Sequence, residues 1–404
     1  MAELPPLEQA RSQARQSPAP APGTAFVPSL RREVCDAGGT ETLPGALARA
    51  EGDEPSRDEA VDEAYEGLGA THALFREIYG RASVDGAGGL LAATVHYGRE
   101  YDNAFWNGER MVCGDGDGEV FQRFTKSLTV IAHELTHGVV QYTSRFEYRE
   151  QAGALNESVS DVFGVLTEQK LLRQEAAEAT WLVGAGLFTE QVSGTAIRSL
   201  KAPGTAYDDD VLGRDPQPAT MAGYVSTAAD NGGVHINSGI PNHAFYLAAT
   251  TLGNFAWEHA GQIWYDTITE QDLPADCTFA LFAAGTLAAA GNATAPTARS
   301  TPPSPVPGKR WACSHEDRGG PFGRVRRPDP GLERPGQRRG SGTGMAPPAA
   351  GSTAGTSGRP RPVCLRIPGG GNRSDAARAV RAGPLAGSGR TRPAGRCRQS
   401  GAGR

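Results

Sequence analysis

The chain has 404 residues, of which 38% are hydrophobic, and a formal net charge of −5. This charge is the sum of two unlike parts, because residues 1–294 carry 19 basic and 40 acidic side chains whereas residues 295–404 carry 21 basic and 5 acidic ones; each part is therefore interpreted separately. The absence of any apolar run of about 18 residues excludes a transmembrane helix, and six scattered cysteines without a CxxC pair argue against a disulfide framework in so long a chain.

The N-terminal region begins with a polar stretch and a Pro/Ala linker at residues 17–23. It contains no apolar segment of the kind found in secretory signal peptides, and we expect residues 1–32 to be disordered or the remnant of a pro-segment. The following region mixes short β-type runs with Gly/Asp/Asn turns, which predicts strands near residues 92–97 and 111–113 and a helix over residues 59–79.

From about residue 121, apolar residues recur every three to four positions. This spacing predicts helices over residues 128–142, 155–166, 239–252 and 277–290. A β-rich lobe followed by a helical lobe is an α+β arrangement. We therefore expect an N-terminal catalytic lobe over residues 33–145 and a helical C-terminal lobe over residues 146–294, with the active site in a cleft between the two lobes.

The sequence His-Glu-Leu-Thr-His at residues 133–137 lies in the first of these helices. His133 and His137 are four residues apart and share one helix face, so both imidazoles can bind the same metal ion. Glu134 is adjacent to the ligands without being one, which is the position of the general base in a zinc peptidase. The alternative is a buried helix with two hydrogen-bonded histidines and no metal.

A catalytic zinc ion usually has three protein ligands and one position for water. The candidate for the third ligand is Glu157, in the segment GALNESVSD at residues 153–161. Asp161 lies one helical turn further along the same face and can accept a hydrogen bond from the second ring nitrogen of a ligand histidine. Taken alone, Glu157 and Asp161 would be interpreted as an exposed acidic helix face.

A zinc site of this kind hydrolyses peptide bonds. Zinc lowers the pKa of its bound water towards about 7 and polarises the scissile carbonyl, and Glu134 can take the proton of that water. The developing oxyanion needs further hydrogen-bond donors. His235 is one candidate, because it follows two glycines, and Asp230 can orient and charge its imidazole. Without the zinc motif, His235 would be interpreted as an ordinary surface-loop histidine.

Several separate segments between residues 34 and 290 resemble, in order and spacing, the thermolysin-like neutral metallopeptidases. They are DNAFWNG (102–108), GDGDG (114–118), HELTH (133–137), GALNESVSD (153–161), IRSL (197–200) and DNGGVHINSG (230–239). The resemblance implies that family's fold, with the HELTH helix between a β-rich and a helical lobe. It also implies the family's reaction, the hydrolysis of internal peptide bonds in proteins.

The resemblance further implies roles for individual residues around the metal. Four residues correspond to the zinc ligands and the general base: His133, His137 and Glu157, and Glu134. His235 corresponds to the residue that stabilises the transition state. Asp230 corresponds to the partner of that histidine, and Tyr148 to a second oxyanion donor.

Other residues correspond to the family's substrate-binding positions. Asn103 and Ala104 match the edge-strand residues that bind an extended substrate backbone. Arg198 matches the residue that holds a substrate carbonyl beside the S1′ pocket, and Phe121 and Val130 would line that pocket. The implied preference is for a bulky apolar residue directly after the cleaved bond.

The resemblance also implies a cofactor, partners and a location. Zinc is the expected metal, and proteins or peptides are the expected substrates. We expect a monomer that is secreted and acts on no nucleic acid or membrane. The short region before residue 33 resembles the branch of the family that has a short propeptide.

The sequence departs from the family at the paired calcium site. Of its acidic ligands only Glu168 remains, because uncharged residues occupy the other positions: Thr129, Thr180, Leu182 and Ala185. Calcium prefers six to eight oxygen ligands, mostly charged. We therefore predict that the paired calcium site is absent, and leave open a weak single site.

The second departure is the tail. After about residue 290, a segment rich in Gly, Ala, Pro and Arg takes the place of the family's last helices. These four amino acids have GC-rich codons, so reading a GC-rich gene out of frame would produce such a segment. We therefore interpret residues 295–404 as a disordered tail produced by a frameshift. Arg/Gly segments can bind RNA, but Trp311 and Phe322 are the only aromatic residues available for stacking. The alternative for the whole chain is an inactive or unstable truncated relative that only binds peptide.

Overall fold

The computed structural model describes residues 29–294. The expectations for the tail therefore lie outside the described residues, as do those for the pro-segment except at residues 29–32.

A five-stranded mixed sheet forms the N-terminal part of the fold, in the order β2-β1-β3-β5-β4. Its strands are β1 (Arg32–Asp36), β2 (Ala46–Ala50), β3 (Leu91–Val95), β4 (Ala104–Trp106) and β5 (Met111–Cys113). The central pairs β1–β3 and β3–β5 are parallel, and β4 pairs with β5 in the antiparallel direction. Strand β4 therefore lies at one edge of this sheet.

Helix α2 (Glu59–Tyr79) packs against the sheet and against the next helix, α3. The carboxylate of Asp58 caps its first turn by accepting hydrogen bonds from the backbone N–H groups of Ala60 and Val61. Gly80 ends the helix in the left-handed conformation, at φ 70°, which glycine adopts without steric cost. Local capping signals thus define both ends of α2.

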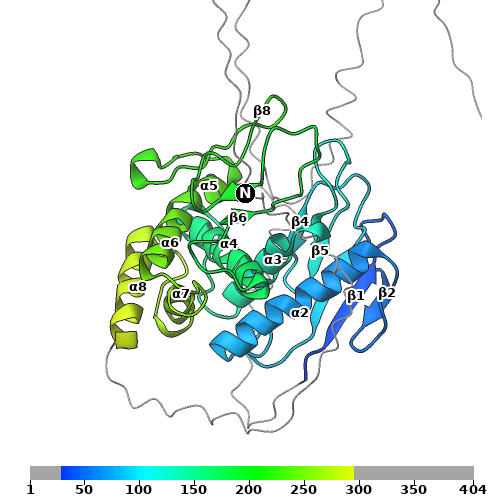
Figure 1. Cartoon of the computed structure of the whole chain (residues 1–404), viewed down its shortest axis with the longest axis horizontal. Helices are drawn as coiled ribbons and strands as arrows, with labels where there is room; N and C mark the ends of the chain where they lie inside the picture. Colours follow the sequence, from blue (N-terminus) through cyan, green and yellow to red (C-terminus); the bar gives the residue numbers. More distant parts are fainter. Residues whose placement is uncertain (1–28, 295–404) are drawn as a thin grey trace, which may run out of the picture. The chain divides into compact units, whose positions relative to one another are not determined.

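The remainder of the described chain is largely helical. Its helices are α3 (Leu128–Gln141), α4 (Glu150–Leu172), α5 (Asp230–Asn237), α6 (Gly239–Leu252), α7 (Ala260–Glu270) and α8 (Phe279–Thr294). Two short antiparallel strand pairs lie in the long segment between α4 and α5: β6 (Leu182–Val183) with β7 (Arg198–Ser199), and β8 (Asp208–Asp209) with β9 (Gly213–Arg214). In Figure 1, α3 and α4 lie between the sheet with α2 on one side and α5, α6, α7 and α8 on the other.

The pair α3–α4 lies at the centre of the described fold. All 14 residues of α3 are buried, and α4 makes its most extensive helix–helix contact with α3. The close approach depends on Gly164 of α4, because a Cβ atom there would lie 2.7 Å from the backbone oxygen of Thr129. Both helices are therefore held tightly, and side chains that project from them are rigidly positioned.

The structure confirms the α+β class and several predicted elements. The helices expected over residues 59–79 and 239–252 agree with α2 and α6, and the strand expected at 111–113 is β5. The periodicity predicts the last helix two residues too early, since α8 begins at Phe279. None of the described helices is both long and apolar enough to cross a membrane.

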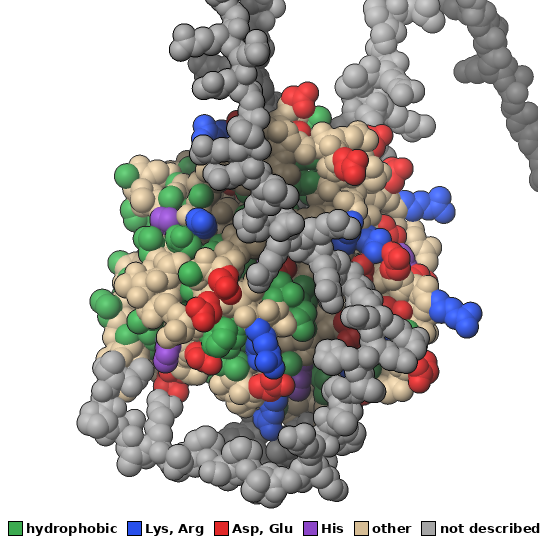
Figure 2. Space-filling view, viewed as in Figure 1, with side chains coloured by type: hydrophobic (Ala, Val, Ile, Leu, Met, Phe, Trp, Pro, Cys, Tyr) green, Lys and Arg blue, Asp and Glu red, His purple; other side chains and the backbone are tan. Residues whose placement is uncertain are grey.

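One surface of the helical part is unusually apolar. Figure 2 shows hydrophobic side chains gathered over α6 and α8. The most exposed of them are Leu247 and Leu252 on α6 and Leu281 and Leu287 on α8. Helix α8 contains no charged residue, which is unusual for a helix with an exposed face.

Candidate active site

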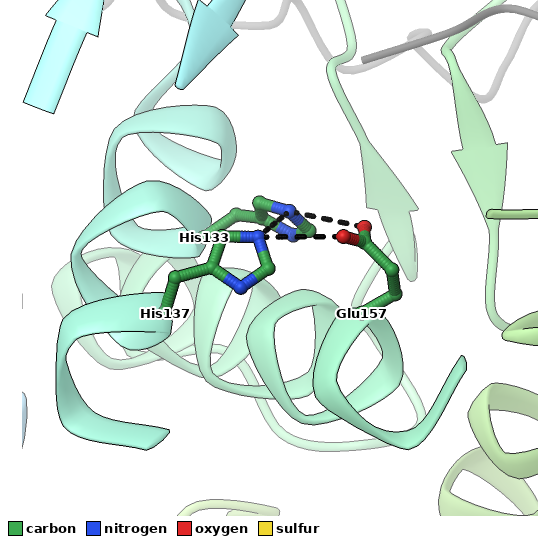
Figure 3. A group of neighbouring side chains, drawn as sticks. All are labelled: His133, His137 and Glu157. Atoms are coloured by element: carbon green, nitrogen blue, oxygen red, sulfur yellow. Dashed lines mark hydrogen bonds and ion pairs between the residues drawn. The ribbon is translucent and has the colours of Figure 1, made fainter. Parts of the chain in front are cut away.

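Three metal-binding side chains meet where α3 and α4 pack together. His133 and His137 project from successive turns of α3, and Glu157 faces them from α4 (Figure 3). The two histidine Nε2 atoms are 3.1 Å apart. The Glu157 carboxylate oxygens lie 3.4 Å from Nε2 of His133 and 3.5 Å from Nε2 of His137. Among the described residues, this is the one group of His, Cys, Asp and Glu side chains with ligand atoms all within 4.8 Å of one another.

Hydrogen bonds at Nδ1, on the side of each ring away from Glu157, orient both imidazoles. Asp161 Oδ1 lies 2.8 Å from Nδ1 of His133, and Asn156 Oδ1 lies 2.8 Å from Nδ1 of His137. The Ser160 hydroxyl is also 3.1 Å from Nδ1 of His137. With each Nδ1–H donated outwards, the lone pair of each Nε2 points into the space shared with Glu157.

This donor set fits a zinc ion. Two imidazole lone pairs at such a short distance repel each other unless a cation lies between them. Burial lowers the pKa of His133, but the interactions with the neighbouring carboxylates of Asp161 and Glu157 outweigh burial and raise that pKa to about 9, so the surroundings favour a positive charge at this place. Two histidines and one carboxylate form a ligand set of catalytic zinc sites.

His235 and Tyr148 contact the same Glu157 carboxylate. The Tyr148 hydroxyl donates to Oε1 of Glu157 and lies 3.2 Å from Nε2 of His235. Nε2 of His235 is 3.5 Å from Oε2 of Glu157. The three expected metal ligands and the two expected oxyanion donors are thus brought together in space from positions far apart in the sequence.

Asp230 fixes His235 through two contacts. Its carboxylate lies 2.6 Å from Nδ1 of the ring and accepts a hydrogen bond of 2.8 Å from the backbone N–H of His235. Residues 231–233 have positive φ angles of 49°, 89° and 80°, a left-handed stretch that returns the chain towards Asp230 and for which two of the three residues are glycine. Burial lowers the pKa of His235, but Glu157 and Asp230 outweigh it and raise the pKa above the usual value.

Asp161 connects His133 to Arg198. The guanidinium of Arg198 binds the Asp161 carboxylate in a bidentate manner, with distances of 2.8 Å from Nε and 2.7 Å from Nη2. Burial raises the pKa of Asp161, but the charge of Arg198 and the hydrogen bond with His133 outweigh it and hold that pKa at about 2. Asp161 is therefore a buried anion at neutral pH.

The expected substrate-binding residues lie in elements next to this centre. Ala104 is on the edge strand β4, which packs against α3, and its backbone N–H donates to the side chain of Asn103. Val130 is on α3, one turn before His133, and Phe121 precedes that helix and packs against Phe124 and Phe188. Phe121 and Val130 are only 5% and 1% exposed and belong to the hydrophobic core.

The structure adds four polar residues to the site that the sequence motifs do not identify. They are Asn156 and Ser160 behind His137, Asn242 beside Asp161, and Gln217, whose side-chain amide donates to the backbone oxygen of His235. Asn156 and Ser160 could have been found, because they lie beside Glu157 and Asp161 in the segment 153–161. Gln217 lies 18 residues before His235 in a loop, and no local pattern identifies it.

A small sheet followed by packed helices, with two histidines and a glutamate converging in the core, fits the class of zinc-dependent metallopeptidases. Family models agree with this class over most of the described chain. Residues 32–141 match the thermolysin metallopeptidase catalytic domain, and residues 144–300 match the thermolysin metallopeptidase alpha-helical domain.

Individual relatives give the same result. The chain is 54% identical over 256 residues to an extracellular metalloprotease of Pectobacterium carotovorum subsp. carotovorum, covering 63% of this chain and 74% of that protein. It is 41% identical over 208 residues to thermolysin of Alicyclobacillus acidocaldarius subsp. acidocaldarius, covering 51% and 36%. The precursor of protealysin, a metalloproteinase from Serratia proteamaculans, superposes with a TM-score of 0.65 at 48% identity, covering 70% of this chain and 92% of that structure. The chain belongs to the thermolysin metallopeptidase family and is a metalloendopeptidase.

Proposed function

We propose that this enzyme cleaves internal peptide bonds of proteins at a zinc ion held by His133, His137 and Glu157. The observation that carries the proposal is the convergence of these three buried side chains, each ring being oriented from behind by its own hydrogen bond. When bound there, zinc supplies a Lewis acid that polarises the scissile carbonyl and acidifies a water molecule.

The protein's own residues supply the proton transfers. Glu134 is buried on α3 next to His133. We assign it as the general base that takes the proton of the attacking water and delivers it to the leaving amine nitrogen. Its place beside the ligands, without being one of the three converging groups, supports this role.

His235 and Tyr148 are assigned to stabilising the oxyanion. Asp230 holds Nδ1 of His235, so Nε2 is the nitrogen directed towards the centre. Because the pKa of His235 is raised, the ring is protonated over more of the neutral range and donates from Nε2. The Tyr148 hydroxyl, beside Glu157 and His235, is the second donor.

The substrate is an extended peptide that adds to the edge of the sheet. Strand β4 has β5 on one side and is the last strand on the other, which is the arrangement that accepts an added strand through Asn103 and Ala104. Arg198 holds a substrate carbonyl, and Phe121 and Val130 favour a bulky apolar residue after the cleaved bond. The apolar side chains of both residues, one on α3 and one before it, support this preference.

We also propose that the enzyme acts outside the cell as a monomer and is made with a pro-segment. Relatives named extracellular metalloproteases support the location outside the cell. A structural neighbour named as a precursor supports the pro-segment.

The Glu134→Ala variant tests the assignment. We expect it to retain one zinc ion per chain and to lose cleavage of an unstructured protein by about 100- to 10,000-fold, the range of general-base catalysis. Glu178→Ala, at an exposed position after α4, is the matched control and should behave as the unaltered enzyme.

The competing function is a relative that binds peptide without cleaving it. Stoichiometric zinc in the unaltered chain with no cleavage, and no difference from Glu134→Ala, would favour that function. Equal cleavage by both proteins would remove Glu134 from the mechanism.

A further inference from the structure

The carboxylate of Asp161 receives a complete set of hydrogen bonds. Oδ1 accepts from His133 and from Nη2 of Arg198, and Oδ2 accepts from Nε of Arg198 and from Nδ2 of Asn242 at 2.8 Å. These four contacts fill the lone-pair positions of a carboxylate. Asp161 is fully buried, so no water competes for them.

Asn242 differs from the other partners of Asp161. It is uncharged, it belongs to the first turn of α6, and it is fully buried. Its Oδ1 atom has no hydrogen-bond partner. Burying an amide oxygen without a partner costs free energy. The hydrogen bond from Nδ2 to Asp161 is the polar contact that offsets this cost, and it therefore explains why the position holds an asparagine.

We propose that Asn242 is a positioning residue of the zinc site. Its hydrogen bond keeps Asp161 in the orientation that serves His133 and Arg198 together, and it connects α6 to the α3–α4 pair. This inference rests on the proposed zinc site and extends it by one residue that touches neither the metal ligands nor substrate.

The consequence of losing this bond follows from the geometry. Without Asn242, one position on Oδ2 is empty, and the carboxylate can pivot on the Arg198 guanidinium. Such a pivot moves Oδ1 relative to Nδ1 of His133 and loosens the direction of the His133 lone pair. His137 is not affected, because Asn156 and Ser160 orient its ring.

The experiment uses the full chain with Asn242→Leu, which keeps the side-chain volume and removes the donor. Zinc affinity is measured by competition with a chelator. Loss of a direct hydrogen-bond partner of a ligand costs 10- to 100-fold in metal affinity, and since Asn242 acts one bond further out we expect about a 3- to 10-fold weakening. Asn242→Ala is measured in parallel, so that the test does not depend on the folding of one variant.

A spectroscopic measurement separates positioning from a general loss of stability. In zinc-loaded protein labelled with ¹⁵N-histidine, the Nδ1–H signal of His133 should shift and broaden in both variants, whereas that of His137 should not. Gln169→Leu is the matched control. Gln169 is a buried amide on α4, eight residues beyond Asp161, and unlike Asn242 it has no hydrogen-bond partner at either its amide nitrogen or its amide oxygen. We expect that replacement to leave zinc affinity and both histidine signals unchanged.

The outcomes separate failure of the zinc site from failure of the positioning role of Asn242. If the unaltered chain binds no zinc, the proposed function fails. If the unaltered chain binds zinc and the Asn242 variants bind it equally well with an unchanged His133 signal, only the positioning role is overturned. Equal changes at His133 and His137 would indicate a structural role and would also overturn it.

Discussion

At the residue scale, the two expected histidine ligands are supported by different groups. His133 is backed by the carboxylate of Asp161, and His137 by the amide of Asn156. A carboxylate raises the basicity of the ring it contacts more than an amide does. Asp161 also forms an ion pair with Arg198. Its buried negative charge is therefore paired while it keeps the His133 ring basic.

His235 depends on Asp230 for its protonation state, which leads to a prediction for Asp230→Asn. This change removes a negative charge that raises the pKa of His235, so the ring becomes neutral at a lower pH. We expect kcat/KM to fall about 10- to 100-fold near neutral pH, with KM little changed. The alkaline limit of the pH–rate profile should move to lower pH.

Steady-state kinetics from pH 5 to pH 9 measure both effects. Asp210→Asn, at an exposed position in the loop between β8 and β9, is the control and should leave the profile unchanged. A profile for Asp230→Asn that is lower but not displaced would contradict the role assigned to its charge.

The residue types and spacing of residues 133–137 and 153–161 predict which side chains could meet, and the structure brings them together. They do not predict Asn242, because its contact joins α6 to α4 across 81 positions of the sequence. A hydrogen bond between distant elements depends on how those elements pack, and no local sequence pattern predicts that packing.

At the element scale, the centre depends on how closely α3 and α4 approach each other. Gly164→Val should separate the two helices, because the added side chain would meet the backbone oxygen of Thr129 and lie near the backbone nitrogen of His133. We expect a loss of about 1–3 kcal/mol in the free energy of unfolding, typical of overpacking. Zinc affinity should fall as well.

Urea unfolding and chelator competition measure these two quantities. Gly291→Ala, on α8, is the control: among the described residues a Cβ atom there would meet no other atom within 4 Å, and alanine favours a helix over glycine, so neither stability nor zinc affinity should fall. Unchanged zinc affinity in a destabilised Gly164→Val protein would show that the helix spacing does not set the ligand geometry.

Elements with strong local patterns were predicted best. Helix α2 has an aspartate cap and a terminal glycine, and its bounds agree with the prediction. Helix α7 was not predicted, although it packs against α8 and α6. The sequence also does not predict strands β1 and β2, which acquire their regularity by pairing with each other and with β3.

At the scale of the whole molecule, His96 joins three segments. Its ring lies 2.9 Å from Asp115 in the loop after β5 and 3.2 Å from Asp58 at the start of α2. The hydrogen bond to Asp115 opposes the effect of burial and, with the charges of both aspartates, raises the pKa of His96 to about 9.

This shift predicts how stability depends on pH. An unfolded histidine titrates near about 6.5, so the folded protein holds an extra proton between that value and about 9. The contribution of His96 to the free energy of unfolding is fully present below pH ~6.5 and is lost as pH rises through about 9. Its size is roughly 1–3 kcal/mol. Urea unfolding from pH 6 to pH 9.5 should show this difference between the unaltered chain and His96→Gln, and parallel curves would refute it.

The predicted loss of the paired calcium site also concerns the whole fold. Thr129 is at one of the positions where the resemblance implies a calcium ligand, and its hydroxyl accepts a hydrogen bond from the backbone N–H of Gly184. Burial raises the pKa of Glu168 to about 7. One weakly acidic carboxyl cannot provide the charged oxygens that two calcium ions need. Calorimetric titration with calcium should show no pair of tight sites, and detection of two tightly bound ions would contradict this prediction.

The central claim is that the three ligands hold a zinc ion that drives peptide hydrolysis. The most direct measurement is cleavage of an unstructured protein by the purified full chain before chelation, after removal of metal by a chelator, and after zinc is restored. We predict cleavage before chelation, its loss in the metal-free protein, and recovery with about one zinc ion per chain. Cleavage that persists without metal, or a chain that binds one zinc ion and cleaves nothing, would contradict the claim.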